Sequence, residues 1–284
     1  MPELPTPIVS PEALRERGLA GLRVLDARMG PDARERYAAR HLEGAVFVDL
    51  ETELSGDTSR PERGGRHPLP SLEDWALTLG RLGITPTTPV VVYDDAGGAK
   101  AAARAWWMLR AVGHDAVAVL DGGLPAAEAA GLPTASGETT VEPAPPYPVE
   151  RWVAPTKTID EVAALGRDEG WRLIDVRARE RYRGDREPLD PAAGHIPGAR
   201  NVPLAENLDE GGRFLAPEAL RALYAERLGD VSAARVVVSC GSGVTACHTV
   251  LALEHAGLPG ASLYVGSWSE WCRSGREGAT GDTP

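Results

Sequence analysis

The sequence predicts an α/β protein built from two copies of one unit, each with a parallel sheet covered by helices on both faces. In both halves of the 284-residue chain, short apolar runs typical of buried strands alternate with stretches typical of helices. Segments of the first half recur in the same order in the second half, which indicates a tandem repeat. The chain is long enough for two domains that each bury a core.

Five pairs of similar segments define the repeat. Residues 22–28 and 171–177 are both apolar strands that end in Asp-x-Arg, and the pentapeptide Ala-Arg-Glu-Arg-Tyr occurs at 33–37 and again at 178–182. The other pairs are 41–45 with 195–199, 90–94 with 236–240, and 120–123 with 264–267. Unrelated α/β units share a pattern but rarely a pentapeptide, so these matches favour a duplication.

A proline-rich stretch separates the two copies. Residues 133–155 contain repeated prolines and show little apolar periodicity. This composition is typical of an extended, semi-stiff connector that runs over the surface. The predicted domains are therefore residues 1–132 and 156–284.

Composition and charge argue against several classes of partner and location. The formal net charge is −11 and the isoelectric point is about 5.1, which disfavours nucleic acid and anionic membranes as general partners. No apolar run approaches the length of a membrane span, and the opening Met-Pro-Glu-Leu-Pro lacks the basic and apolar regions of a signal peptide. Three cysteines, an odd and small number, predict a reduced cytoplasmic protein without a disulfide framework.

The candidate nucleophile is Cys240, which lies between a predicted strand and a loop of small residues. Residues 236–238 are three valines, typical of a buried parallel strand, and the apolar run 249–256 predicts a helix that ends at Gly257. The loop amides and the helix N-terminus would face one centre, and both favour negative charge there. We therefore interpret Cys240 as a catalytic thiolate rather than an inert core thiol.

The first copy lacks this nucleophile. Asp94 stands at the position of Cys240 and is followed by Asp-Ala-Gly-Gly instead of Gly-Ser-Gly-Val. An aspartate cannot act as a sulfur nucleophile. We therefore predict a catalytically silent first domain, retained for packing and as one wall of a cleft between the domains.

Several other chemistries do not fit the residues that follow Cys240. A cysteine phosphatase needs Cys-x5-Arg, but the sixth residue after Cys240 is Ala246. A Cys-His hydrolase needs a histidine within reach, and His248 on the next predicted helix would point away from the loop. The Gly-x-Gly at 241–243 lacks the third glycine of a dinucleotide site. The cysteines and His248 have no zinc-ligand spacing, so we expect neither a metal nor a cofactor.

Sulfur transfer is the chemistry that remains. A thiolate takes the outer sulfur of a donor, becomes a persulfide and passes that sulfur to an acceptor thiol. The persulfide is a larger anion than the thiolate, and a ring of loop amides would stabilise it without a metal. Small residues at 241–243 allow the backbone to curve around the additional sulfur.

The loop also resembles that of a known family. Cys-Gly-Ser-Gly-Val-Thr at 240–245 is similar to the active loop of the tandem-domain rhodanese-like sulfurtransferases that use 3-mercaptopyruvate. Asp-Val-Arg at 175–177, Gly-His-Ile-Pro-Gly-Ala at 194–199 and Gly-Ser-Trp-Ser-Glu-Trp at 266–271 look like further signatures of this family. The resemblance covers the whole chain. It implies two α/β domains, each with a five-stranded parallel sheet, of which only the second carries the nucleophile.

The resemblance implies roles for individual residues. It places Arg181 on the carboxylate of the substrate, and His67 resembles the histidine that the first domain contributes, with Glu51 or Asp49 as its acidic partner. It assigns Ser242 to proton transfer or to orienting the carbonyl group of the substrate, and it groups Thr245 with the catalytic residues. The persulfide-binding and anion-binding loop would consist of Gly241, Ser242, Gly243, Val244 and Thr245.

The neutral loop favours 3-mercaptopyruvate as the donor. Family loops that prefer the thiosulfate dianion tend to carry basic side chains just after the cysteine, whereas this chain has Gly-Ser there. A single carboxylate and a keto group suit an arginine with hydroxyl donors. Where similar family members carry a second arginine, this chain has Leu189. Either Arg183 or Arg186 is expected to replace it, or the carboxylate is held less firmly.

Some alternatives stay open at this point. The acceptor is a thiol such as that of thioredoxin, or cyanide, and thiosulfate remains an alternative donor. A persulfide carrier that serves one protein partner is a further alternative. Arg181 fits a structural salt bridge equally well, because Arg36 repeats it in the silent half. Cys247 is expected in the core of its helix, and His195 is expected to stabilise a turn, because His41 repeats it.

Overall fold

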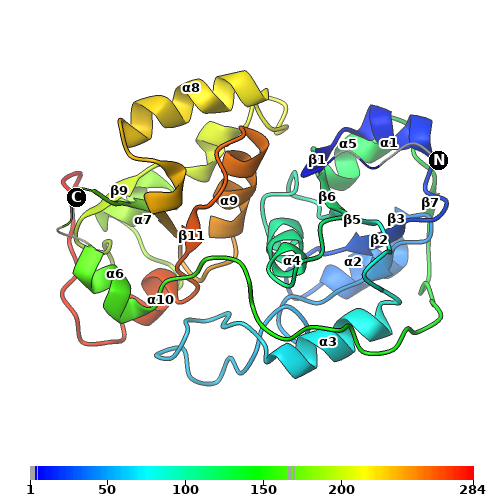
Figure 1. Cartoon of the computed structure of the whole chain (residues 1–284), viewed down its shortest axis with the longest axis horizontal. Helices are drawn as coiled ribbons and strands as arrows, with labels where there is room; N and C mark the ends of the chain where they lie inside the picture. Colours follow the sequence, from blue (N-terminus) through cyan, green and yellow to red (C-terminus); the bar gives the residue numbers. More distant parts are fainter. Residues whose placement is uncertain (1–3, 5, 166–167, 169) are drawn as a thin grey trace. The chain divides into compact units, whose positions relative to one another are not determined.

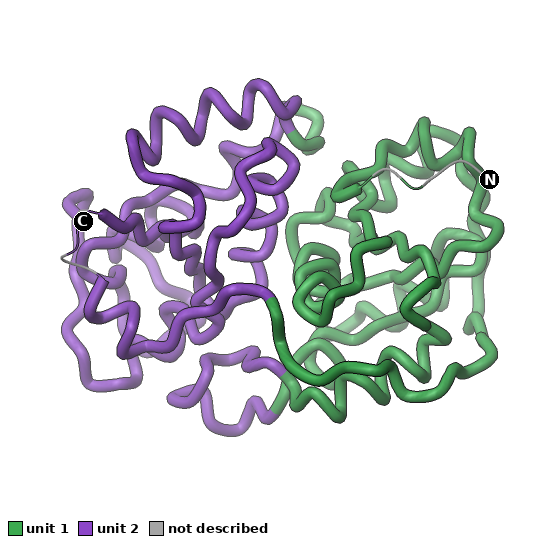
Figure 2. Tube along the Cα trace, viewed as in Figure 1, with its two compact units in different colours: residues 1–56, 70–153, 210–214 green, residues 57–69, 154–209, 215–284 purple. Residues whose placement is uncertain are grey.

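The computed structural model describes residues 4, 6–165, 168 and 170–284. The chain forms two compact units, which Figure 2 shows in different colours. Unit 1 comprises residues 1–56, 70–153 and 210–214, and unit 2 comprises residues 57–69, 154–209 and 215–284. The segment 57–69 of the first half thus belongs to the same unit as Cys240.

Unit 1 contains a five-stranded parallel sheet. In spatial order its strands are β1 (Ile8–Val9), β6 (Val117–Leu120), β5 (Val90–Tyr93), β2 (Arg23–Asp26) and β4 (Val46–Phe47). Every pair is parallel, and all residues of the central β5 are buried, as expected for a strand covered on both faces. The sheet predicted for the first copy is confirmed.

Helices connect these strands (Figure 1). Among the described residues of unit 1 they are α1 (Pro11–Arg17), α2 (Ala33–Ala39), α3 (Leu72–Arg81), α4 (Ala101–Arg110) and α5 (Gly123–Ala129). A short antiparallel pair joins β3 (His41–Leu42) to β7 (Thr134–Ala135). α4 packs on β5 and β6, and burial of all but the last of its residues makes it part of the core.

Unit 2 contains a similar but shorter parallel sheet. In spatial order its strands are β11 (Ser262–Leu263), β10 (Val236–Ser239), β8 (Arg172–Asp175) and β9 (Ala199–Asn201). The fifth position is a single parallel bridge between Thr156 and Leu263. Pro155 has no N–H with which to extend this ladder, so the predicted fifth strand is reduced to one residue pair.

The helices of unit 2 surround its sheet. The described elements are α6 (Ile159–Leu165), α7 (Arg179–Arg183), η1 (Leu204–Asn207), α8 (Pro217–Leu228), η2 (Ala233–Arg235), α9 (Ala246–His255) and α10 (Ser267–Trp271). α9 packs on β10 and β11. It begins at Ala246, earlier than the predicted residue 249, because the N–H groups of Cys247 and His248 already bond to the carbonyls of Val244 and Thr245. Gly257 follows its last turn with φ +74°, as predicted.

The histidine of each repeat stabilises a turn, as predicted. The ring of His195 stacks on Tyr182 with 3.7 Å between centroids, and its Nδ1 lies 2.8 Å from the carbonyl oxygen of Tyr182. His41 and Tyr37 repeat both contacts in unit 1, at 4.2 Å and 2.8 Å. These pairs tie the repeated pentapeptide to the segment that follows it, and they account for the strongest sequence match between the halves.

Two further observations concern all described residues. Across these ranges no helix is both long and apolar enough to cross a bilayer, and no group of His, Cys, Asp and Glu side chains is arranged to hold a metal ion. The three cysteines are free thiols, with Cys240 and Cys247 buried and Cys272 half-buried.

Candidate active site

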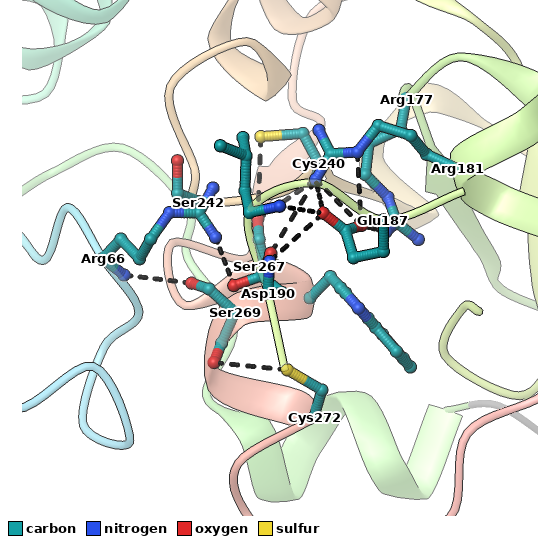
Figure 3. A network of polar contacts seen from close by, with 12 residues as sticks. Arg66, Arg177, Arg181, Glu187, Asp190, Cys240, Ser242, Ser267, Ser269 and Cys272 are labelled. Atoms are coloured by element: carbon teal, nitrogen blue, oxygen red, sulfur yellow. Dashed lines mark hydrogen bonds and ion pairs between the residues drawn. The ribbon is translucent and has the colours of Figure 1, made fainter. Parts of the chain in front are cut away.

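Cys240 lies directly after β10, at the carboxyl end of a central strand of the unit 2 sheet (Figure 3). Its Sγ accepts a hydrogen bond from the backbone N–H of Gly243 at 3.1 Å, and only 1% of the residue is exposed. α9 starts just beyond the loop at Ala246. A loop amide and a helix N-terminus therefore lie at the thiol, and both favour a negative charge on sulfur.

Ser267 also contacts Cys240, and this role was not predicted from the sequence. Its Oγ accepts the N–H of Cys240 at 3.0 Å, donates to the carbonyl of Tyr264 at 2.9 Å and lies 3.9 Å from the Cys240 Sγ. Ser267 has φ +52°, which makes it the one left-handed residue other than glycine in the described part of the chain. Strained backbone of this kind clusters at functional sites. No local sequence pattern predicts this backbone conformation at Ser267.

The loop is fixed by close contact with the start of α10. The carbonyls of Cys240 and Gly241 accept the N–H groups of Trp268 and Ser269 at 3.1 and 2.9 Å. Gly243 has φ +74°, and a Cβ there would lie 2.3 Å from the carbonyl oxygen of Val265. Only glycine fits this position, which explains the Gly-Ser-Gly sequence.

Ser242 and His67 form a hydrogen-bonded pair. His67 Nδ1 lies 2.8 Å from Ser242 Oγ, and Ser242 is 7% exposed. The resemblance implied both residues, and unit 2 brings them together because it includes the segment 57–69. The Oδ1 atom of Asp49, one suggested partner of the histidine, accepts the N–H groups of Glu51 and Thr52 and closes a turn. The acidic partner of His67 stays a prediction.

Thr245 and Val244 end the loop. The carbonyl of Thr245 accepts the N–H of His248 at 3.2 Å, but its side chain makes no capping hydrogen bond to α9. Val244 is buried, and its carbonyl bonds to the N–H of Cys247. The catalytic role suggested for Thr245 stays a prediction.

Arg181 takes part in a chain of buried ion pairs. Its Nη2 donates to Glu187 Oε1 at 2.7 Å, and Glu187 also pairs with Arg177, which is bound to Asp175 at 2.6 Å. Burial by itself would lower the pKa of Arg177, but the charges of Asp175, Glu187 and Cys240 raise it above its ordinary value. Arg177 therefore stays a cation whose charge interacts with Cys240.

Arg181 is also directed at the loop. Its Nη2 and Nη1 lie 3.3 and 3.5 Å from the position that a Cβ would take at Gly241, the neighbour of Cys240. Its side chain is 19% exposed, whereas that of Glu187 is 3% exposed. The salt bridge and the ligand-binding interpretation are thus compatible, because the ion pair holds the guanidinium group beside the site.

Arg183 and Arg186 have other surroundings. Arg183 pairs with Asp185 and Asp282, and the hydrogen bond that it donates to Asp185 raises its pKa. Arg186 is exposed, and its backbone N–H bonds to the carbonyl of Glu180. Leu189 is 59% exposed. Among the described residues, neither arginine makes a contact that connects it to the loop of Cys240.

Three charged residues of this site were not predicted from the sequence. Asp190 has a fully buried side chain, and its Oδ1 accepts hydrogen bonds from Arg66 Nη1 and from Arg273 Nη1, the second at 2.8 Å (Figure 3). The pairs are 124 and 83 residues apart along the chain. The only local signal is that Arg66 directly precedes His67.

The remaining candidate thiols and imidazoles are structural. Cys247, on the first turn of α9, is buried and donates its S–H to the carbonyl of Gly243 in the preceding loop. Burial lowers the pKa of His248 to about 3, so this ring is neutral at physiological pH. Burial and the negative charge of Asp190 raise the pKa of Cys272, which keeps this thiol protonated.

In unit 1, the loop equivalent to that of Cys240 is filled by its own carboxylate. Asp94 is buried, and its Oδ1 accepts the N–H groups of Ala96 and Gly98, both at 2.8 Å. Its Oδ2 accepts those of Lys100 and Ala102 at 3.0 and 3.3 Å. The amides that could bind an external anion are therefore occupied by the side chain that replaced the cysteine.

Asp94→Asn is expected to destabilise unit 1 by about 2 kcal/mol, because an amide has only one oxygen and leaves two of the four N–H groups without an acceptor. Chemical denaturation of the variant measures this loss. The exposed Asp115, in the same unit, is the matched control as Asp115→Asn. Equal stability of the Asp94 variant and the wild type would show that the carboxylate does not organise the loop.

Comparisons with known proteins agree with this geometry. Residues 10–130 and 158–274 each match the family of the rhodanese-like domain. A Pseudomonas aeruginosa protein named "Probable 3-mercaptopyruvate sulfurtransferase" is 45% identical over 250 residues, which cover 87% of this chain and 86% of that protein. Human 3-mercaptopyruvate sulfurtransferase is 39% identical over 92% of this chain and 88% of the human protein. A thiosulfate sulfurtransferase of Cricetulus griseus is also 39% identical, with the same coverage.

Solved structures give the same result. A 3-mercaptopyruvate sulfurtransferase from Leishmania major superposes with a TM-score of 0.82 at 32% identity, covering 95% of this chain and 75% of that one. SseA from Escherichia coli, described as a 3-mercaptopyruvate sulfotransferase with the rhodanese fold, gives a TM-score of 0.77 at 33% identity, covering 93% and 99%. Similarity thus extends over both repeats, and the relatives carry two different donor names.

Proposed function

Because this chain belongs to the family of rhodanese-like sulfurtransferases, we propose that it moves a sulfane sulfur from 3-mercaptopyruvate, through a persulfide on Cys240, to a thiol acceptor. The environment of Cys240 supports this proposal most strongly. Its sulfur faces a loop amide, and arginine side chains lie beside the neighbouring Gly241. Anions are stabilised at this position without a metal.

The first step forms one S–S bond and breaks one C–S bond. The Cys240 thiolate attacks the sulfur of 3-mercaptopyruvate, and the electron pair of the C–S bond passes to the methylene carbon. The resulting enolate of pyruvate takes a proton at carbon, and the persulfide gives up the proton of the former donor thiol, so protons balance. Ser242 and His67, 2.8 Å apart, are suited to carry this proton and to orient the keto group.

The second step regenerates the enzyme. An acceptor thiolate attacks the outer sulfur of the persulfide, the S–S bond to Cys240 breaks, and Cys240 leaves as a thiolate. We propose a thiol such as that of thioredoxin as the acceptor, with cyanide as an alternative.

The organisation of the chain supports three further proposals. We propose residues 1–132 and 156–284 as the two domains and 133–155 as their linker, which fits the family matches at 10–130 and 158–274. The first domain would be catalytically silent, because Asp94 replaces the nucleophile. The free thiols of Cys240, Cys247 and Cys272 support the reducing cytoplasm as the location.

The donor is tested by steady-state kinetics. The kcat/KM for 3-mercaptopyruvate, followed as pyruvate release in the presence of reduced thioredoxin, is expected to exceed that for thiosulfate with the same acceptor. The single carboxylate of the donor fits the neutral Gly-Ser that follows Cys240. A higher kcat/KM for thiosulfate would overturn the assignment of the donor and leave the assignment to the family intact.

Arg181→Ala is expected to raise the KM for 3-mercaptopyruvate at least about tenfold, because a charge-assisted contact to a carboxylate contributes roughly 1.5–3 kcal/mol. Arg179→Ala is the matched control on α7, since that side chain is 68% exposed and pairs with Asp282. An unchanged KM for the Arg181 variant would restrict Arg181 to its salt bridge with Glu187.

A further inference from the structure

The segment 57–69 brings His67 into unit 2, although it lies between β4 and α3 and forms no helix or strand of its own. Backbone without a regular ladder of hydrogen bonds is held in place by individual contacts. The hydrogen bond between His67 Nδ1 and Ser242 Oγ, at 2.8 Å, therefore depends on the contacts that fix this segment beside the Cys240 loop.

Ser269, on α10, contacts the backbone on both sides of this hydrogen bond. Its N–H donates to the carbonyl of Gly241 at 2.9 Å, and its Oγ accepts the N–H of Arg66 at 3.0 Å (Figure 3). Gly241 directly precedes Ser242, and Arg66 directly precedes His67. One residue thus holds the backbone next to each partner of the pair.

The hydroxyl group of Ser269 has a fixed direction. The residue is completely buried, and its Oγ donates to the carbonyl of Gly266 at 3.1 Å. Because the hydroxyl proton is used in that bond, the lone pairs of the oxygen are left to accept the N–H of Arg66. A buried hydroxyl with both a donor and an acceptor as partners is suited to hold two segments at a set distance.

The segment lies too close to α10 for a side chain at Gly65. A Cβ there would lie 2.4 Å from the carbonyl oxygen of Gly266 and 2.6 Å from Ser269 Oγ, and Gly65 has φ +81°. The neighbouring Gly64 donates its N–H to Glu270 Oε1 at 2.9 Å. Two consecutive residues of α10 therefore accept N–H groups of the segment, and glycine permits this close approach.

We propose that Ser269 is a positioning residue for sulfur transfer, which acts through His67 by holding the segment 57–69 at the distance that the hydrogen bond to Ser242 requires. This inference rests on the function proposed above, in which that pair carries a proton and orients the keto group. Arg181, the residue proposed for the donor carboxylate, is held separately by Glu187. Loss of the Ser269 hydroxyl should therefore slow turnover more than it weakens donor binding.

The kinetic test is Ser269→Ala in the full chain. With 3-mercaptopyruvate, kcat is expected to fall about tenfold while KM stays within threefold, because the donor still binds but the proton-carrying pair is displaced. Ser274→Ala is the matched control and should keep both values within twofold, since its hydroxyl also donates to a carbonyl three residues earlier, that of Trp271 at 2.7 Å. If Ser269→Ala does not fold, Gly65→Ala takes its place and should lower kcat at least as much. A wild-type kcat in the folded variant overturns the proposal.

A double-mutant cycle with His67→Ala shows whether Ser269 acts through the histidine. When the imidazole is already absent, replacing Ser269 should lower kcat by less than about twofold, because the group that it positions is gone. A tenfold loss in both backgrounds would mean that Ser269 supports the fold or another group, and it would overturn the proposal.

A spectrum of the free protein separates this inference from the proposed function. The imidazole nitrogens of isotope-labelled histidines are observed by NMR without any sulfur donor, and the His67 signals are identified by their absence in His67→Ala. They should shift in Ser269→Ala, because Nδ1 loses its bond to Ser242, and stay in place in Ser274→Ala. This shift supports the positioning role whichever donor the enzyme prefers. Unchanged His67 signals in Ser269→Ala overturn the proposal.

Discussion

Replacing Cys240 by serine is expected to abolish sulfur transfer, with turnover reduced roughly a thousandfold or more, because a serine hydroxyl cannot form a persulfide. The fold should be retained, since serine is similar in size and its oxygen can accept the Gly243 N–H that now bonds to Sγ at 3.1 Å. The measurement is pyruvate release from 3-mercaptopyruvate, together with thermal unfolding of the same preparation.

Cys247→Ser and Cys272→Ser are the controls for this variant. The buried Cys247 thiol donates to the loop carbonyl of Gly243, and the pKa of the Cys272 thiol is raised, so neither is expected to carry the transferred sulfur. Both variants should therefore still release pyruvate from 3-mercaptopyruvate at the rate of the wild type. Activity that remains in Cys240→Ser and disappears only when Cys272 is also replaced would show that Cys272, and not Cys240, is the nucleophile.

Gly243→Ala is expected to cost about 3 kcal/mol of stability and to remove most of the activity. The residue has φ +74°, and a Cβ would lie 2.3 Å from the backbone oxygen of Val265, which cannot move without displacing the chain before α10. That displacement would also turn the Gly243 N–H away from the Cys240 sulfur. Chemical denaturation and pyruvate release measure the two effects.

Gly275→Ala is the control that separates backbone strain from steric collision. Gly275 has φ +77° in the same unit, and its Cβ position has no atom within 4 Å. The control should lose only about 1 kcal/mol, the cost of the left-handed conformation, and should keep full activity. Similar losses in the two variants would mean that the loop adapts to a side chain at Gly243 and that the close contact with Val265 is not required.

Much of the architecture could be predicted because its strands and helices produce recognisable patterns of residues that are close in sequence. Valine runs marked β5 and β10, and the repeated Asp-x-Arg marked the ends of β2 and β8. The placement of Cys240 followed from the same periodicity, since a strand end, a glycine-rich loop and a helix are consecutive in sequence. The fifth strand of unit 2 was predicted to be longer than it is, because one residue, Pro155, ends the pairing and the apolar pattern gives no sign of this.

The rest of the site depends on contacts between distant parts of the chain. Gly65 lets the segment 57–69 lie on α10, where Arg66 meets Asp190, and no periodicity predicts such an approach. Ser267 is recognisable as a support of Cys240 only through its strained φ and its hydrogen bond. Asp94 is similar: the sequence shows that a nucleophile is absent, and the structure shows that its carboxylate occupies the loop amides.

The central claim is that Cys240 carries the transferred sulfur, and intact-protein mass spectrometry tests it most directly. After incubation with 3-mercaptopyruvate without acceptor, the wild-type chain should gain the mass of one sulfur atom, located by peptide mapping on Cys240, and should lose it again on addition of reduced thioredoxin. Cys240→Ser should gain nothing. A wild-type protein that releases pyruvate but never carries the added sulfur, or that carries it on Cys272, would contradict the account.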